Sequence, residues 1–216
     1  KNPALADTWT RLLAEAEAKP GREAQIEAAR DAFYRGFVAE AIDRYLRDAC
    51  VMDAAGGRRK GVLTAEDMAG WQASYEAPIS TRYKVWTVWL GGPWTQGPAL
   101  LQSLQILDGF GLDALDLNGA RFVHLVSEVM KLAFADREAY YGDPDHTDIP
   151  MNALLSEKYA ETRRALISEI ASVEQRPGQL PGHESWTAAA LRHASEDYVS
   201  GGGTGAGEPT MAHLSQ

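Results

Sequence analysis

The longest helical pattern in the chain, from about Gly119 to Tyr140, is the feature that most limits how the chain can fold. Its apolar residues recur every three or four positions, which is the spacing of one helix face. They form a broad stripe of the kind that packs against a core. The stripe consists of Phe122, Leu125, Val126, Val129, Leu132, Ala133 and Phe134.

Further helices are expected on both sides of this segment. Thr64 with Asp67 three residues later is typical of a helix N-cap, and Pro98 suits the first turn of a helix that carries four leucines. The leucines are Leu100, Leu101, Leu104 and Leu107. The expected helices run over about Ala4–Ala18, Glu23–Phe33, Gly36–Cys50, Thr64–Gln72, Pro98 onward, Gly119–Tyr140 and Ser156–Val173.

One stretch has strand character. Tyr83 to Leu90 alternates and is rich in β-branched and aromatic residues, and both of its faces are largely apolar. The pattern predicts one strand that is covered on both sides, ended by Gly91-Gly92-Pro93. The fold class is therefore α+β and predominantly α-helical, a helical lobe with one or two strands. The expected parts are a helical segment 1–76, a strand and turn 77–97, a helical segment 98–199 and a flexible glycine-rich tail 200–216, together one domain.

Composition excludes several classes of partner. The 216 residues are 45% hydrophobic and 24% charged, which is ordinary for a globular protein and rules out wholesale disorder. A net charge of −9 argues against nucleic acid or an anionic membrane as a partner. No segment has the length of a membrane span, and no signal-peptide pattern is present. Lys1 has the character of an internal start, and the compartment, periplasm or cytoplasm of a bacterial-type cell, stays open.

Two groups of side chains deserve a test as metal sites. Asp143, Asp145, Thr147 and Asp148 offer oxygen ligands, but a calcium loop needs glycine where Asp148 stands and glutamate where Leu154 stands. A solvated turn is expected there. His124 and Glu128 lie four residues apart without a spaced third ligand, so a core or helix-edge histidine with an i+4 partner is expected.

The remaining candidates also favour structural roles. The tail fits a dinucleotide fingerprint poorly, since it follows no strand, and is expected to be a linker. Arg58-Arg59-Lys60 is expected to be a solvated loop and Cys50 a buried thiol. The tryptophans are expected to pack in a core, and no histidine has a Ser or Cys partner that the sequence justifies. The fingerprint would use Gly201, Gly203 and Ala206 of the tail. The tryptophans of the strand are Trp86 and Trp89, and the histidines are His146, His183, His193 and His213.

The end of the long helix carries several charges. Asp136, Arg137 and Glu138 are expected to pair among neighbours, with Gly142 as the C-cap and Pro144 beyond it. The residues by themselves thus assign no catalytic, cofactor-binding or metal-binding residue.

Several stretches together resemble the γ-glutamyltransferase (γ-glutamyltranspeptidase) family. The most specific element is Lys131 followed by Ala135-Asp136-Arg137 and then Gly142-Asp143-Pro144. The opening KNPALADTWTRLLAE and the segment LLSEKYAETRRALI add to the resemblance, which covers most of residues 2–167.

The resemblance implies part of an N-terminal nucleophile hydrolase with an αββα fold. Such a precursor cuts itself into a large and a small subunit, and the small subunit's first residue, a threonine, is the nucleophile. This chain would be the C-terminal part of the large subunit, with the small subunit as its partner in a heterodimer, a γ-glutamyl compound as substrate and no cofactor. Lys1 cannot be the nucleophile. In the family a threonine two residues before a histidine marks the cleavage point, and Met211 stands at that position before His213. Either this site is inactive or the threonine lies beyond Gln216, and the second is expected.

The sequence departs from the family pattern at one turn. Gly92-Pro93-Trp94-Thr95-Gln96-Gly97 stands where the family has proline-x-serine-glycine-glycine, which suggests a divergent branch. A cephalosporin or glutaryl acylase of the same superfamily is therefore an alternative. A non-catalytic helical interaction module is another.

Overall fold

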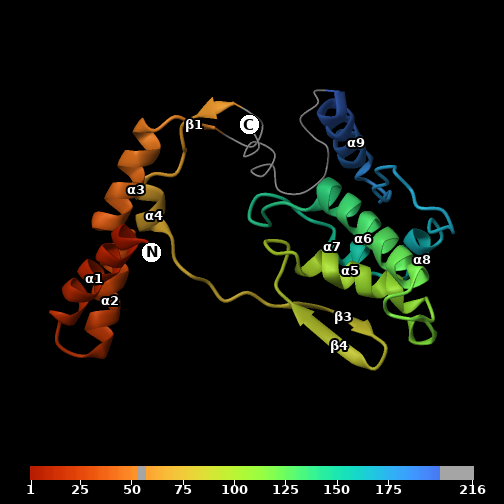
Figure 1. Cartoon of the computed structure of the whole chain (residues 1–216), viewed down its shortest axis with the longest axis horizontal. Helices are drawn as coiled ribbons and strands as arrows, with labels where there is room; N and C mark the ends of the chain where they lie inside the picture. The colour runs from red at the N-terminus through yellow and green to blue at the C-terminus, as the bar shows by residue number, and fades with distance from the viewer. Residues whose placement is uncertain (53–56, 200–216) are drawn as a thin grey trace. The chain divides into compact units, whose positions relative to one another are not determined.

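The computed structural model of the chain describes residues 1–52 and 57–199 (Figure 1). It divides into two compact units whose described parts are residues 1–52 with 57–74, and residues 75–199. Each unit is considered by itself, and the expectation that all segments form one domain stays a prediction. The chain is predominantly helical with short strands, as its sequence predicts.

The first unit is built on three helices joined by tight turns. Asn2 caps the first helix, because its Oδ1 accepts the Leu5 N–H at 3.1 Å, and Pro3 begins the helix where its missing N–H costs nothing. Gly21 adopts a φ of 82° between the first two helices, a conformation that favours glycine. The helices are α1 (Pro3–Glu17), α2 (Arg22–Tyr34) and α3 (Phe37–Asp48).

A small two-stranded sheet and a short helix complete this unit. The strands β1 (Val51–Met52) and β2 (Arg58–Arg59) pair antiparallel, and α4 (Ala65–Gly70) follows. Thr64 and Asp67 form the expected cap reciprocally, since each side chain binds the backbone N–H of the other. The prediction of a buried Cys50 is wrong, because α3 ends at Asp48 and the exposed thiol lies in the extended segment before β1.

The second unit opens with a hairpin where the sequence pattern predicts one strand. The chain reverses at Lys84, whose φ is 55°, so β3 (Ile79–Tyr83) pairs antiparallel with β4 (Trp86–Leu90). The Lys84 N–H donates to Asp108 Oδ1 at 3.3 Å and its carbonyl accepts from Arg82 Nε at 3.2 Å. These contacts hold a residue other than glycine in the left-handed region, which alternation alone does not reveal.

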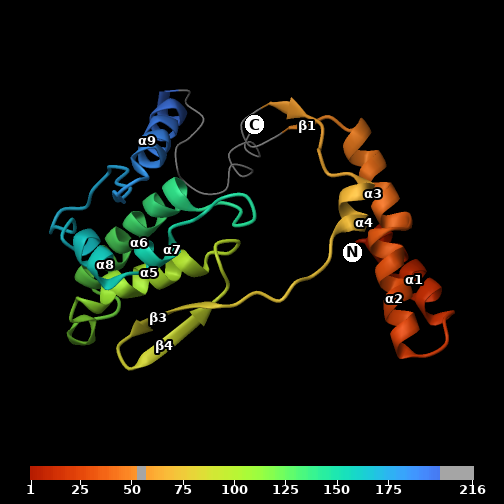
Figure 2. The same ribbon diagram turned by 180° about the vertical axis from the view of Figure 1, so that it is seen from behind.

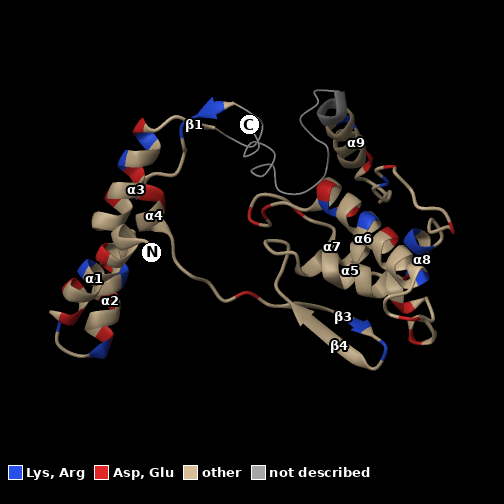
Figure 3. Cartoon of the chain, viewed as in Figure 1, with Lys and Arg blue, Asp and Glu red and all other residues tan. Residues whose placement is uncertain are grey.

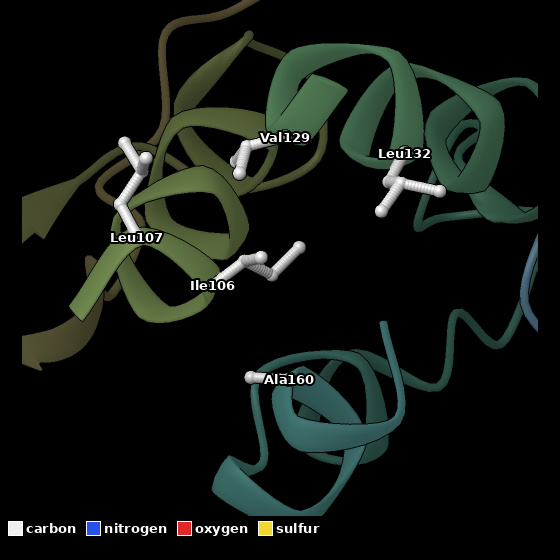
Figure 4. Packing of buried hydrophobic residues seen from close by; sticks show 5 residues of the cluster. All are labelled: Ile106, Leu107, Val129, Leu132 and Ala160. Carbon is white, nitrogen blue, oxygen red and sulfur yellow. The ribbon is translucent and has the colours of Figure 1, made fainter. Parts of the chain in front are cut away.

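Helices α5 (Gly97–Asp108) and α6 (Ala120–Tyr140) form the centre of this unit and pack side by side (Figure 2). A short 3-10 turn, η1 (Leu112–Ala114), lies between them in sequence. The core beneath them joins α5, α6 and α8 (Glu157–Arg164), as Figure 4 shows. Its buried members are Ile106, Leu107, Val129, Leu132 and Ala160.

A second apolar cluster lies farther along α6, where Tyr140 packs with Leu154, Tyr159 and Leu180. Leu154 ends the short α7 (Met151–Leu154), and Leu180 precedes α9 (Glu184–Val199), which contacts α6. This arrangement fixes both flanks of the long helix.

Two predicted helix features differ in the structure. The helix expected to reach Val173 ends at Arg164, since the chain beyond it is held by hydrogen bonds to α6 rather than by its own turns. The prediction of Gly142 as the C-cap is also wrong. Tyr141 ends α6 in an extended conformation, and Gly142 has no positive φ.

Candidate functional site

Charged residues of both signs occur along most helices of the chain (Figure 3), and two carboxylates of α6 are buried. The exposed fraction is 1% for Glu128 and 0% for Asp136. They lie eight residues apart, so they project from the same side of the helix about two turns apart. Buried charges are stable only when they are paired, so their partners define the site.

Asp136 is the centre of a buried polar network. Its Oδ2 lies 3.1 Å from Arg163 Nε and accepts Gln102 Nε2 at 3.1 Å, and its Oδ1 accepts the Gly178 N–H at 2.7 Å. Burial raises the pKa of Asp136 above its ordinary value, while the Arg163 charge and the Gly178 and Gln102 hydrogen bonds oppose this rise. The carboxylate thus joins α5, α6, α8 and the segment before α9.

Two tyrosines at the end of α6 extend this network. Tyr140 Oη donates to the Gly178 carbonyl at 2.6 Å and accepts the Leu180 N–H at 3.2 Å. Tyr141 Oη donates to Gln102 Oε1 at 2.6 Å. Burial raises the pKa of both tyrosines, so both hydroxyls keep their protons at neutral pH and act as hydrogen-bond donors.

Gly178 is required by its close contact with Tyr159. A Cβ at Gly178 would lie 2.0 Å from Tyr159 Oη and 3.1 Å from Arg163 Cδ. The Tyr159 hydroxyl is buried close to the Asp136 carboxylate. Burial, followed by the Asp136 charge, raises the pKa of Tyr159. Because Gly178 has no side chain to collide with Tyr159, its backbone N–H can reach Asp136.

Glu128 forms a second network on the same helix. Its carboxylate accepts Lys131 Nζ at 2.6 Å, Arg176 Nη2 at 2.9 Å and the Ser172 N–H at 3.2 Å. Burial opposes ionisation, but these hydrogen bonds and the charge of Lys131 outweigh it, so the pKa of Glu128 lies below its ordinary value. The carboxylate is therefore charged at neutral pH.

Both networks bind the same irregular segment to α6. Lys131 Nζ also donates to the Ser172 carbonyl at 2.8 Å, and His124 Nε2 lies 2.7 Å from the Ser168 carbonyl. The two carboxylates therefore bind charged side chains and backbone N–H groups of the protein itself. The arrangement fixes the segment that joins α8 to α9 and leaves these carboxylates without a free reactive role.

The predictions for Asp136 and, in part, for His124 are wrong. Asp136 was expected to pair with neighbours but binds Arg163 and Gly178 across the fold, whereas Arg137 does pair with Glu138. His124 binds the Ser168 carbonyl rather than Glu128. One signal was present in the sequence, because both carboxylates fall on or beside the apolar stripe where a charge must be buried.

The acidic loop after α6 forms a turn, as expected. Asp143 Oδ1 accepts the Asp145 N–H at 2.8 Å, and the Asp143 carbonyl accepts the His146 and Thr147 N–H groups. No cluster of three or more His, Cys, Asp or Glu side chains suited to a metal occurs within residues 1–52 and 57–199. The oxygen atoms of this loop thus serve its own backbone.

Of the other candidates, His183 lies beside these networks, and its ring packs edge-on against Tyr140 at 6.1 Å between ring centroids. His183 Nδ1 lies 3.3 Å from the Pro181 carbonyl, and Arg58 Nη2 donates to the Cys50 carbonyl. The prediction that Trp86 and Trp89 pack in a core is wrong for this chain, because they are 70% and 61% exposed on β4. His193 lies on α9. Gly201, Gly203, Ala206, Met211 and His213 lie outside the described residues.

The divergent turn between β4 and α5 is closed by a threonine. Thr95 Oγ1 donates to the Gly92 carbonyl at 3.0 Å and accepts the Gly97 N–H at 2.9 Å. Arg137 Nη1 reaches Gln96 Oε1 at 3.1 Å and thereby ties the end of α6 to this turn.

None of the helices in the described ranges combines the length and the apolar character that crossing a membrane requires.

Comparison with known proteins identifies the family to which the chain is similar. The sequence model of the family described as gamma-glutamyltranspeptidase matches residues 1–202. A glutathione hydrolase proenzyme of Escherichia coli (strain K12) is 31% identical over 177 residues, which are 80% of this chain and 29% of that protein. An acylase ACY 1 proenzyme of Pseudomonas sp. (strain SE83) is 32% identical over 157 residues, 72% of this chain and 26% of the relative.

A solved structure agrees with these relatives. The structure of LmbA2991HD superposes with a TM-score of 0.72 at 48% identity, over 85% of this chain and 30% of the other. The chain thus spans less than a third of the length of these relatives. On the match over residues 1–202 and these similarities, the chain belongs to the gamma-glutamyltranspeptidase family.

Proposed function

We propose that the complete protein is a γ-glutamyltransferase or glutathione hydrolase that cleaves γ-glutamyl amides. The observation that carries this proposal is the family match over residues 1–202, together with the 31% identity to a glutathione hydrolase proenzyme. The acyl group would be carried by an N-terminal threonine outside this chain and passed to water or to an amino acid. No metal or organic cofactor takes part in this scheme.

In this proposal the chain is the C-terminal part of the large subunit, and its partner is the small subunit of the same precursor. The structure supports a scaffold role, since Glu128 and Asp136 are used to anchor backbone. The exposed Trp86 and Trp89 give the β3–β4 hairpin an apolar surface suited to the rest of the enzyme. The chain by itself is expected to be inactive.

The test is to express the complete coding sequence and to identify every polypeptide by intact mass and N-terminal sequencing. Two chains are expected, the smaller beginning with threonine, together with turnover of a γ-glutamyl anilide. Replacing that threonine by alanine provides the control, in which cleavage and turnover are both lost.

Other results would redirect or overturn the proposal. Turnover of glutaryl-cephalosporin alone would overturn γ-glutamyl specificity in favour of an acylase, the activity named for the Pseudomonas relative. A single uncleaved chain without turnover of either substrate would overturn the enzyme proposal and favour an interaction module.

A further inference from the structure

A cavity of ≈ 450 Å³ lies in the second unit between the β3–β4 hairpin, the end of α5 and the start of α8. Its volume falls within the range of small-molecule sites. Charged side chains of both signs line it, contributed by Arg82 and Lys84 of the hairpin, Asp108 of α5, and Glu157 and Arg164 of α8. It is separate from the networks around Asp136 and Glu128.

Gln105 forms part of the wall of this cavity. Its Nε2 donates to the Leu155 carbonyl at 2.8 Å, which fixes the orientation of the amide. Its Oε1 is buried and is therefore closed to a ligand, so the side chain shapes the cavity without binding its contents.

Some of the charges are already used within the protein. Lys84 Nζ lies 3.6 Å from Asp108 Oδ1. Arg164 donates from Nε to the Ile106 carbonyl and from Nη2 to the Gln105 carbonyl, each at 2.9 Å, and so caps α5. These groups shape the wall of the cavity.

One charge of each sign remains available. Arg82 uses only Nε, which binds the Lys84 carbonyl, so its terminal nitrogens have no partner within residues 1–52 and 57–199. Glu157 forms no ion pair with any residue that the structure describes. Arg82 and Glu157 line one cavity but do not reach each other, which leaves space for a molecule that carries both complementary charges.

We propose that this cavity binds a zwitterionic ligand of the size of a dipeptide. The ligand's ammonium group binds the Glu157 carboxylate, and its carboxylate binds the terminal nitrogens of Arg82. Neither a simple anion nor a simple cation uses both groups. The proposal is independent of the chemistry assigned to the complete enzyme.

The test is titration calorimetry of the complete protein with L-alanyl-L-alanine. Millimolar or tighter binding is expected, with a loss of about tenfold in Glu157→Gln and in Arg82→Gln. Glu161→Gln, on the same helix but outside the cavity, is the matched control and should leave the affinity unchanged. The N-acetylated and the C-terminally amidated dipeptides should each bind about tenfold more weakly to the wild type.

The variants also locate the site, because both substituted side chains are on the surface and circular dichroism can verify folding. Absence of wild-type binding at about 10 mM dipeptide would overturn the proposal. Equal affinity in wild type, Glu157→Gln and Arg82→Gln would assign any binding to another part of the protein and overturn it as well.

Discussion

Replacing Asp136 by asparagine tests whether the buried carboxylate holds the second unit together. The substitution preserves the shape of the side chain and one oxygen for the Gly178 N–H, but it removes the charge beside Arg163. Arg163 is only 2% exposed, so its guanidinium would remain buried without a carboxylate. The new amide nitrogen would also face Gln102 Nε2, which is itself a donor.

Removing one partner of a buried ion pair costs about 3–5 kcal/mol, because the other charge stays buried. Urea unfolding of the 216-residue chain, followed by circular dichroism and fluorescence, measures this loss. With an m-value of about 1–3 kcal/mol per molar urea, the midpoint of the second unit should fall by about 1–5 M. Trp186 packs near Tyr140, at 6.1 Å between ring centroids, so its fluorescence reports on this region.

Glu138→Gln is the matched control for Asp136→Asn, since Glu138 is on the same helix but exposed, and it should change stability by no more than about 0.5 kcal/mol. The double variant Asp136→Asn with Arg163→Met should lose less than the sum of the two single variants, since no buried charge is left unpaired. A loss below about 1 kcal/mol for Asp136→Asn, or strict additivity in the cycle, would refute the reasoning.

Three further predictions concern single contacts. Gly178→Ala should destabilise the chain by about 2–4 kcal/mol in urea unfolding, because its Cβ would collide with Tyr159 Oη; an unchanged midpoint would contradict the contact. The pKa of Glu128 is lowered in the folded state, so its contribution is present above about pH 4.3 and is lost as pH falls through the folded value. The stability difference between wild type and Glu128→Gln should therefore shrink below that pH, and a constant difference would contradict this. Thr64→Ala should destabilise α4 by about 1 kcal/mol, measured as hydrogen exchange of its amides, whereas Thr10→Ala at the exposed face of α1 should leave these amides unchanged.

Local rules predict where two helices of this chain begin, because the signals that start them are local. The Thr64–Asp67 pair caps α4, and Pro98 lies in the first turn of α5. Leu125, Val129, Leu132 and Ala133 of the predicted apolar stripe of α6 are buried, whereas Phe134 is 39% exposed.

The features that the sequence does not reveal depend on contacts between distant residues. Lys84 reverses the chain without glycine or asparagine, because Asp108 and Arg82 bind its backbone. The helix after Ser156 ends at Arg164, since the following backbone finds its partners on α6 instead. Aspartate is usually found at the protein surface. Only the fold brings Arg163 to Asp136.

The buried charges of α6 make physical sense as partners for an irregular backbone. The segment from Leu166 to Leu180 forms neither helix nor strand, and Pro177 precedes Gly178 within it, so its polar groups need partners outside the segment. Glu128 accepts the Ser172 N–H and Asp136 accepts the Gly178 N–H. Arginines donate hydrogen bonds to the carbonyls of the segment. Arg163 Nη2 donates to the Arg176 carbonyl, and Arg176 Nη1 donates to the Leu166 carbonyl. Apolar residues of equal volume would fill the same space but would leave these groups unsatisfied, which costs about 1–3 kcal/mol for each one buried. The charges therefore stabilise the path of the chain from α8 to α9, and packing alone cannot replace them.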